Sequence, residues 1–146
     1  QEKSLLFHLE RLSNNAIPIP DVAIDSAIKL AEEEQGFTFT DEQLQAIQYA
    51  HKYGVSLIIG SAGTGKSATV NGIAKTTPHE QYRACALSGR AVDVLKDKGV
   101  ERSATIHREF QLHVPFSEEF EPPCLNTVEE PDLVIFDEFS MIDVGL

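Results

Sequence analysis

The fold of this 146-residue chain is decided by the stretch Val55-Ser56-Leu57-Ile58-Ile59-Gly60-Ser61-Ala62-Gly63-Thr64-Gly65-Lys66-Ser67. An apolar run at 55–59 leads into residues 60–67, which fit the pattern G-x-x-x-x-G-K-[ST] of a phosphate-binding loop. Glycines let such a loop turn its backbone N–H groups toward one anion, and the helix that follows directs its positive end to the same point. The pattern predicts a strand at 55–59, then the loop, then a helix over 66–75.

Each position in the loop has a predicted role in binding ATP and Mg²⁺. The ammonium group of Lys66 would reach the β- and γ-phosphates, and the hydroxyl of Ser67 would ligate Mg²⁺. Backbone N–H groups would hold the other phosphate oxygens, and they come from Gly60, Ser61, Ala62, Gly63, Thr64 and Gly65. The alternative is a glycine-rich turn without a ligand, but the apolar run before the loop and the helical pattern after it favour nucleotide binding.

A second stretch, Asp132-Leu133-Val134-Ile135-Phe136-Asp137-Glu138, narrows the chemistry. Four consecutive apolar residues predict a strand at 133–137 that is buried on both faces, as in a parallel sheet. Asp137 would hold Mg²⁺ directly or through water, and Glu138 would polarise a water for attack on the γ-phosphate. This favours nucleotide hydrolysis coupled to mechanical work; two merely solvated acids are the alternative. We expect both acids within water-bridging distance of Lys66 and Ser67, since metal and γ-phosphate must lie between them.

The composition, with 42% apolar and 24% charged residues, is typical of a globular protein. No apolar stretch approaches 18 residues and no signal peptide is visible, which predicts a cytoplasmic protein that does not enter a membrane. The net charge of −11 comes from two acidic segments, 1–53 and 117–132, while residues 83–113 carry six basic side chains against four acids. Local fields of this kind steer phosphates more than the total charge does. Cys85 and Cys124 lack metal-ligand spacing, and Cys85 is predicted to be a small core residue.

The rest of the pattern predicts an α/β protein with a parallel sheet, because strands separated by helices imply βαβ crossovers. The predicted elements are helices beginning near Ser4, Asp21 and Thr40, a strand at 83–87, a helix ended by Gly99, and a short helix after Thr105. Gly36 is expected to end the second helix. The acidic, proline-containing residues 113–131 are predicted to form a long loop without chemistry.

Four segments in register resemble the RecD-type superfamily 1 DNA helicases, the group of the exodeoxyribonuclease V alpha subunit. Thr40-Asp41-Glu42-Gln43 with Ala46-Ile47 is similar to the glutamine motif upstream of the phosphate loop. The other three are Ala86-Leu87-Ser88-Gly89-Arg90-Ala91, similar to A-P-T-G-R-A; Ala104-Thr105-Ile106-His107-Arg108, which matches A-T-I-H-R; and Asp137-Glu138-Phe139-Ser140-Met141-Ile142-Asp143, which resembles D-E-A-S-M-V-D. Leu87, Ser88 and Phe139 depart from the family pattern, which has proline, threonine and alanine there.

The resemblance implies further site residues. Gln43 would read adenine through its side-chain amide, although Thr40 and Gln43 also satisfy a helix capping box. Ser88, Gly89 and Arg90 would grip the backbone of single-stranded DNA, with a surface arginine at a helix start as the alternative for Arg90. Thr105 and His107 would contact the same strand, whereas a helix cap and a packed surface histidine are their alternatives.

The resemblance also implies an overall organisation and activity. Residues 36–146 would form an incomplete P-loop NTPase domain, a RecA-like parallel sheet with flanking helices. Residues 1–35 would form a helical segment that ends a preceding module or makes a collar. The expected protein is an ATP-dependent DNA helicase that moves 5′ to 3′ on single-stranded DNA at a duplex junction, in recombination or repair, with recombination-complex subunits as candidate partners.

A second RecA-like domain of the same protein would supply an arginine that stabilises the transferring phosphoryl group. We therefore expect residues 1–146 alone to bind ATP weakly and to hydrolyse it hardly at all. Three alternatives stay open: the helicase part of a conjugative relaxase, another P-loop ATPase or kinase, and a nucleotide-gated DNA-binding module. The Thr-Ile-His-Arg segment favours the RecD type over the relaxase.

Overall fold

The computed structural model describes residues 2–14, 19–61, 63–110 and 132–139. The chain divides into two compact units, residues 1–76 and 77–146, and each is described by itself. None of the helices in the described ranges combines the length and the apolar character that a bilayer crossing requires. The predicted loop at 113–131 and Cys124 lie outside the described residues.

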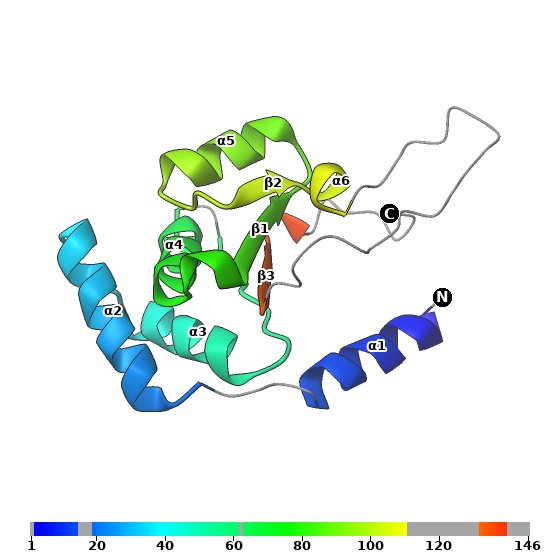
Figure 1. The fold of residues 1–146 in the computed structure, drawn as a ribbon, viewed down its shortest axis with the longest axis horizontal. Coiled ribbons are helices and arrows are strands. Elements are labelled where there is room, and N and C mark those ends of the chain that lie inside the picture. Colours follow the sequence, from blue (N-terminus) through cyan, green and yellow to red (C-terminus); the bar gives the residue numbers. More distant parts are fainter. Residues whose placement is uncertain (1, 15–18, 62, 111–131, 140–146) are drawn as a thin grey trace. The chain divides into compact units, whose positions relative to one another are not determined.

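The first unit is helical and contains the phosphate loop. Its elements are α1 (Glu2–Asn14), α2 (Asp21–Gln35), α3 (Asp41–Lys52) and α4 (Lys66–Thr76) (Figure 1). Helices α2 and α3 pack on α4. The apolar side chains that fill their interface recur at helical spacing, and they are Ile24, Ile28, Ala31, Ile47, Val70 and Ile73. The four predicted helices are confirmed, and α2 ends at Gly36 in the left-handed conformation, with φ of 75°.

Gly72 of α4 packs closely against Ile47 of α3 and against Phe39. A Cβ atom on Gly72 would lie 2.6 Å from Cδ1 of Ile47 and 2.8 Å from Cζ of Phe39, closer than packed heavy atoms allow. Near the ends of the same helices, Nε2 of buried His51 lies 2.7 Å from Oγ1 of Thr76. The Thr76 hydroxyl donates to the carbonyl of Gly72, so His51 is the donor in this pair. Burial lowers the pKa of His51 below its ordinary value of 6.5.

Residues 55–59 do not form the strand that the sequence predicts. They pair with no strand among the described residues, and the side chains of Leu57 and Ile59 are 75% and 83% exposed. A β-strand forms only where its N–H and C=O groups bond to a neighbouring strand, and an apolar composition does not by itself provide that neighbour. The prediction was correct for the loop and the helix that follow, because glycines and helix starts act locally.

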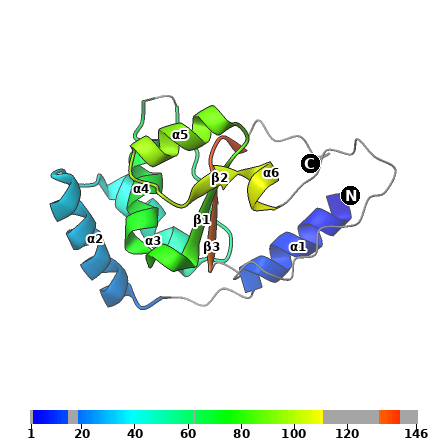
Figure 2. The ribbon, with the colours of Figure 1, turned by 45° about the horizontal axis from the view of Figure 1, so that its top comes forward.

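The second unit contains a three-stranded parallel sheet. Its elements are η1 (His79–Gln81), β1 (Tyr82–Ala86), α5 (Gly89–Asp97), β2 (Ser103–Thr105), α6 (Ile106–Glu109) and β3 (Leu133–Phe136). The strand order is β2-β1-β3, and both pairs are parallel (Figure 2). Helix α5 packs on β1 and β2 through Val92 and Leu95. The parallel α/β arrangement is as predicted, whereas β2 was not predicted, since three residues are too few to show a period.

Strand β3 is less buried than the sequence predicts. The central strand β1 is buried at four of its five residues, but along β3 half-buried and exposed residues alternate. Val134 and Phe136 are 36% and 39% exposed. The cause is the position of β3 at an edge of the described sheet, where only β1 adjoins it.

The boundary predicted near residue 35 stays a prediction. In the structure, α2 packs against α3 and α4 and thus belongs to the compact unit that carries the phosphate loop. Helix α1 lies in the same unit, and the turn at Gly54 adjoins its end. A Cβ atom on Gly54 would clash with the backbone carbonyl of Leu12.

Candidate nucleotide and nucleic-acid site

The phosphate loop of the first unit depends on three of its glycines. Gly63 and Gly65 have φ of 81° and 82°, a left-handed conformation that side-chain-bearing residues rarely adopt. A Cβ atom on Gly60 would lie 2.6 Å from Oγ1 of Thr64. That hydroxyl donates to the carbonyl of Ser61 at 2.8 Å and closes the loop on itself. The predicted loop conformation is therefore present, while Ala62 lies outside the described residues.

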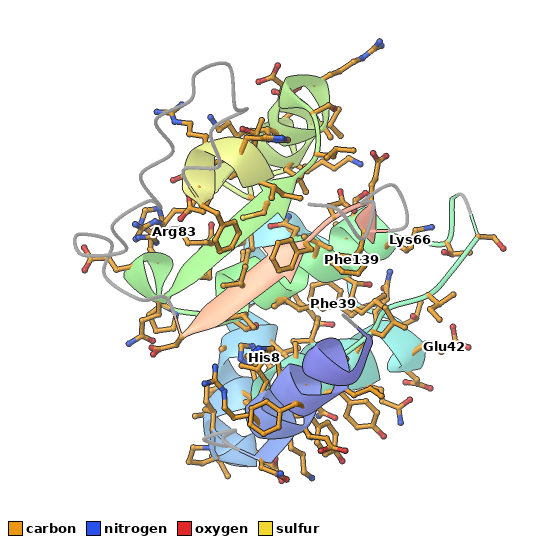
Figure 3. All side chains as sticks on the ribbon, turned by 90° about the vertical axis from the view of Figure 1, so that its right-hand side faces the viewer. His8, Phe39, Glu42, Lys66, Arg83 and Phe139 are labelled. Atoms are coloured by element: carbon orange, nitrogen blue, oxygen red, sulfur yellow. The ribbon has the colours of Figure 1, made fainter. Side chains whose placement is uncertain are left out.

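Lys66 begins α4 and folds its side chain back over the loop. Its Nζ donates to the carbonyl of Gly60 at 2.5 Å and to that of Ser61 at 2.7 Å; Figure 3 labels this side chain. Ser67 occupies the next position in the first turn of the helix and is partly exposed. A cation, a helix N-terminus and left-handed glycines within eight residues fit a phosphate group by charge and by backbone geometry.

Gln43 joins the start of α3 to the loop. Its Oε1 accepts from the backbone N–H of Thr40 at 3.0 Å, while Oγ1 of Thr40 accepts from the N–H of Gln43 at 3.3 Å, so the capping box is complete. Its Nε2 also donates to the carbonyl of Gly65 at 3.3 Å. Both ends of the amide are thus occupied by protein partners. The adenine role implied by the resemblance stays a prediction.

In the second unit, the two acids follow directly after β3. The N–H of Asp137 donates to the carbonyl of Cys85 in β1 at 2.9 Å, which extends the strand pairing by one bond. Glu138 has φ of 55°, the one left-handed non-glycine residue among those described, and its N–H donates to Oδ1 of Asp137 at 3.0 Å. The chain therefore turns sharply at the acids and leaves Glu138 exposed.

The residues predicted to contact DNA lie at the same edge of the sheet. Register pairs Ala86 with Thr105, so β1 and β2 end together; Thr105 is the last residue of β2, and Ser88 lies two residues beyond the end of β1. Both side chains cap helices: Oγ of Ser88 accepts from Ala91, and Oγ1 of Thr105 accepts from Arg108. The alternative of a helix cap is thus confirmed for Thr105, and a cap not predicted from the sequence is present at Ser88.

The other DNA candidates are placed near these two caps. Gly89 and Arg90 are exposed in the first turn of α5, and His107 is half-buried in α6. In parallel α/β proteins, ligands bind outside the carboxyl ends of the strands. That rule favours this edge as a binding surface, and contact with DNA stays a prediction for each of the five residues.

Two features near the sheet were not predicted. Arg83 of β1 pairs with Glu109 of α6, with Nε to Oε1 at 3.1 Å and with side chains only 12% and 18% exposed. Burial and, to a smaller extent, the Glu109 carboxylate raise the pKa of the Cys85 thiol to about 11, although Arg83 opposes the shift. Cys85 is buried, as predicted for a core residue. The second feature is an aromatic contact among Phe110, Phe136 and Phe139. No local sequence pattern reveals the pairing of Arg83 with Glu109 or the contact of Phe110 with Phe136, since each joins positions far apart in the chain.

The predicted distance from Asp137 and Glu138 to Lys66 and Ser67 stays a prediction, because the two pairs belong to different units. In the part of the chain that the structure describes, no three His, Cys, Asp or Glu side chains form a metal-binding group. The role of Ser67 and Asp137 as Mg²⁺ ligands stays a prediction.

Comparison with known families assigns the chain to a class. A family described as an AAA domain matches residues 43–146. The chain belongs to this family of P-loop, helicase-like nucleotide-binding domains of superfamily 1. No curated protein matches the chain significantly. The three-stranded parallel sheet with its helices is consistent with part of the P-loop NTPase α/β fold, and the family implies ATPase or helicase-type activity.

Proposed function

We propose that this chain is the nucleotide-binding part of an ATP-dependent DNA helicase that couples ATP hydrolysis to movement on single-stranded DNA. The observation that carries the proposal is the loop at 60–67, where left-handed Gly63 and Gly65 lead into α4 and Lys66 extends over the loop. The AAA family match supports the ATPase or helicase-type class. The segments that resemble the RecD type support 5′ to 3′ movement in recombination or repair.

Each residue has a defined task in this proposal. The loop backbone from Gly60 to Gly65 binds phosphate oxygens, and Lys66 neutralises charge on the phosphates. Ser67 and Asp137 ligate Mg²⁺, which polarises the phosphoryl group when bound. Glu138 accepts a proton from the attacking water, and its exposed position at the strand end leaves it open to solvent.

The nucleic-acid partner would bind at the carboxyl edge of the second unit's sheet. Ser88, Gly89 and Arg90 can offer a hydroxyl, a backbone N–H and a guanidinium to DNA phosphates, with Thr105 and His107 on the neighbouring element. A second RecA-like domain and recombination-complex subunits are further proposed partners. Both follow from the resemblance to RecD-type helicases.

Substitution of the loop lysine tests the proposal. In the full-length protein, Lys66→Ala should abolish ATP hydrolysis and duplex unwinding together, because the charge over the phosphates is lost. Lys75→Ala is the matched control, since Lys75 lies on the same helix but pairs with Glu34, at 2.9 Å on the protein surface. Unwinding that survives Lys66→Ala would contradict the proposal.

Two further measurements separate the alternatives. ATP hydrolysis that single-stranded DNA does not stimulate would favour a kinase or another P-loop ATPase. Duplexes with a 5′ or a 3′ single-stranded tail test direction, and unwinding only from the 3′ tail would contradict the RecD-type assignment while leaving the ATPase intact.

A further inference from the structure

The turn that holds Glu138 is closed by two phenylalanine rings. Phe136 and Phe139 flank the acids in the sequence, and their ring centroids lie 5.8 Å apart with an interplanar angle of 65°. This edge-to-face geometry is the favoured one for aromatic pairs. Figure 3 labels Phe139 near the C-terminal end of β3. The two rings therefore form a clamp on the turn at Asp137 and Glu138, the two residues that lie between them in the sequence.

The clamp adjoins a residue in an unusual backbone conformation. Glu138 is left-handed, a state that non-glycine residues keep only where their surroundings impose it. Two hydrogen bonds hold one side of the turn: the N–H of Asp137 donates to the carbonyl of Cys85, and the N–H of Glu138 donates to the side-chain Oδ1 of Asp137. On the other side of the turn, the ring of Phe139 contacts the ring of Phe136.

The clamp also reaches α6. Phe110, the residue that ends α6, stacks on Phe136 with centroids 6.0 Å apart and rings nearly parallel at 13°. Helix α6 begins at the Thr105 cap and carries His107. A continuous row of three rings, Phe110–Phe136–Phe139, thus runs from the element proposed to contact DNA to the turn that carries Glu138.

We infer that this aromatic row holds the side chain of Glu138 in position and that it links the orientation of Glu138 to the conformation of α6. Phe139 is a positioning residue, since it acts through Glu138 and touches no reacting atom. The inference rests on the proposed function. It adds that ATP hydrolysis depends on the side chain of Phe139. This side chain is 57% exposed, so its removal leaves the core of the sheet intact.

The first test compares variants of Phe139 in the full-length protein. Phe139→Ala should lower kcat for ATP hydrolysis about 10- to 100-fold, the loss that follows a displacement of about 1 Å. The Kd for a fluorescent ATP analogue with Mg²⁺ should stay within about twofold, because the ring is not a binding group. Phe139→Tyr retains the ring and should retain kcat.

A matched control is available in the first unit. Phe37 is similarly exposed, at 48%, and its ring also makes an edge-to-face contact, with Phe39 at 5.9 Å. Phe37→Ala should leave kcat unchanged. If Phe139→Ala keeps the wild-type kcat, or if Phe37→Ala lowers kcat equally, the inference is overturned, while the proposed function still stands on Lys66→Ala.

The link to α6 requires a coupling measurement, because proximity alone does not demonstrate coupling. Phe110→Leu and Phe139→Leu should each lower kcat, and the double variant should lose no more than the larger single loss, since both act through one row. Losses that multiply would overturn the link.

A second readout does not need turnover. The 146 residues contain no tryptophan, so Phe139→Trp introduces one indole into this chain. A thymidine oligonucleotide should shift its emission, and Phe110→Leu should remove the shift. An oligonucleotide that binds without shifting the emission would overturn the inference.

Discussion

The amide of Gln43 bonds to Thr40 at the start of α3 and to Gly65 in the phosphate loop. The first bond belongs to the capping box, and the second ties the helix to the loop. An amide oxygen has two lone pairs and an amide nitrogen has two N–H groups, so each end of the Gln43 side chain keeps one bonding site while it holds its protein partner. By hydrogen-bonding capacity, the cap of α3 and adenine recognition by Gln43 therefore do not exclude each other.

Two substitutions separate the cap from adenine recognition. Thr40→Ala removes the side-chain cap and should lower the free energy of unfolding by about 0.5–2 kcal/mol, while the amide of Gln43 remains and the preference for ATP over GTP is kept. Gln43→Ala should abolish that preference. Urea unfolding and competition of ATP and GTP against a fluorescent ATP analogue provide the two measurements. If the Gln43→Ala protein still prefers ATP over GTP, Gln43 does not recognise adenine and serves only as a helix cap.

At the scale of elements, the helices could be predicted because their signals are local. Thr40 and Gln43 mark the start of α3, Gly36 marks the end of α2, and apolar periodicity gives the buried face of each helix. Strand pairing is not local. The run at 55–59 has four apolar residues, as β3 has, yet among the described residues only β3 pairs with a strand.

The contact between α3 and α4 gives a prediction at this scale. Gly72→Ala places a methyl group against Ile47 and Phe39, and overpacking of this kind costs about 1–3 kcal/mol. The substitution also gains about 1 kcal/mol of helix propensity. Because the clash involves buried side chains on two elements, we expect a net loss in the free energy of unfolding.

Gly89→Ala is the matched control, since a Cβ atom there meets nothing within 4 Å and φ is not positive. This control should be neutral or slightly stabilising. Urea unfolding of both variants measures the difference. Equal stability of the two proteins would show that the α3–α4 interface can relax around the added methyl group.

At the scale of the whole molecule, the sequence predicted which residue types form the candidate site better than it predicted the contacts among them. The phosphate loop and the pair Asp137 and Glu138 follow from residue types and spacing, and the structure gives each the local turn it needs. The cap at Thr105 is a local contact that the sequence analysis already offered as an alternative, whereas the pairing of Arg83 with Glu109 depends on which residues the fold brings together. No spacing in the sequence encodes that pairing.

The pairing of Arg83 with Glu109 changes which basic side chains are available to bind nucleic acid. The chain carries a net charge of −11, and its basic stretch at 83–113 has six basic side chains. Arg83 is one of the six, but its guanidinium bonds to Glu109 and to the carbonyl of Tyr82, at 3.1 and 2.9 Å. It is therefore unavailable to phosphates. Arg90, in contrast, is exposed at the start of α5 beside the carboxyl edge of the sheet.

This contrast predicts different effects for two arginines of the same stretch. Arg90→Ala should weaken binding of single-stranded DNA by the full-length protein and reduce the slope of log affinity against log salt by about 0.7, the value for one lost phosphate contact. Arg83→Met should leave that slope unchanged. It should instead lower the free energy of unfolding by about 1–3 kcal/mol, because Glu109 keeps its burial and loses its charged hydrogen-bond partner. Fluorescence anisotropy of a labelled thymidine oligonucleotide over a range of salt concentrations measures the slopes. If both substitutions change the slope equally, DNA responds to the summed charge of the molecule, and the carboxyl edge at Arg90 is not its binding surface.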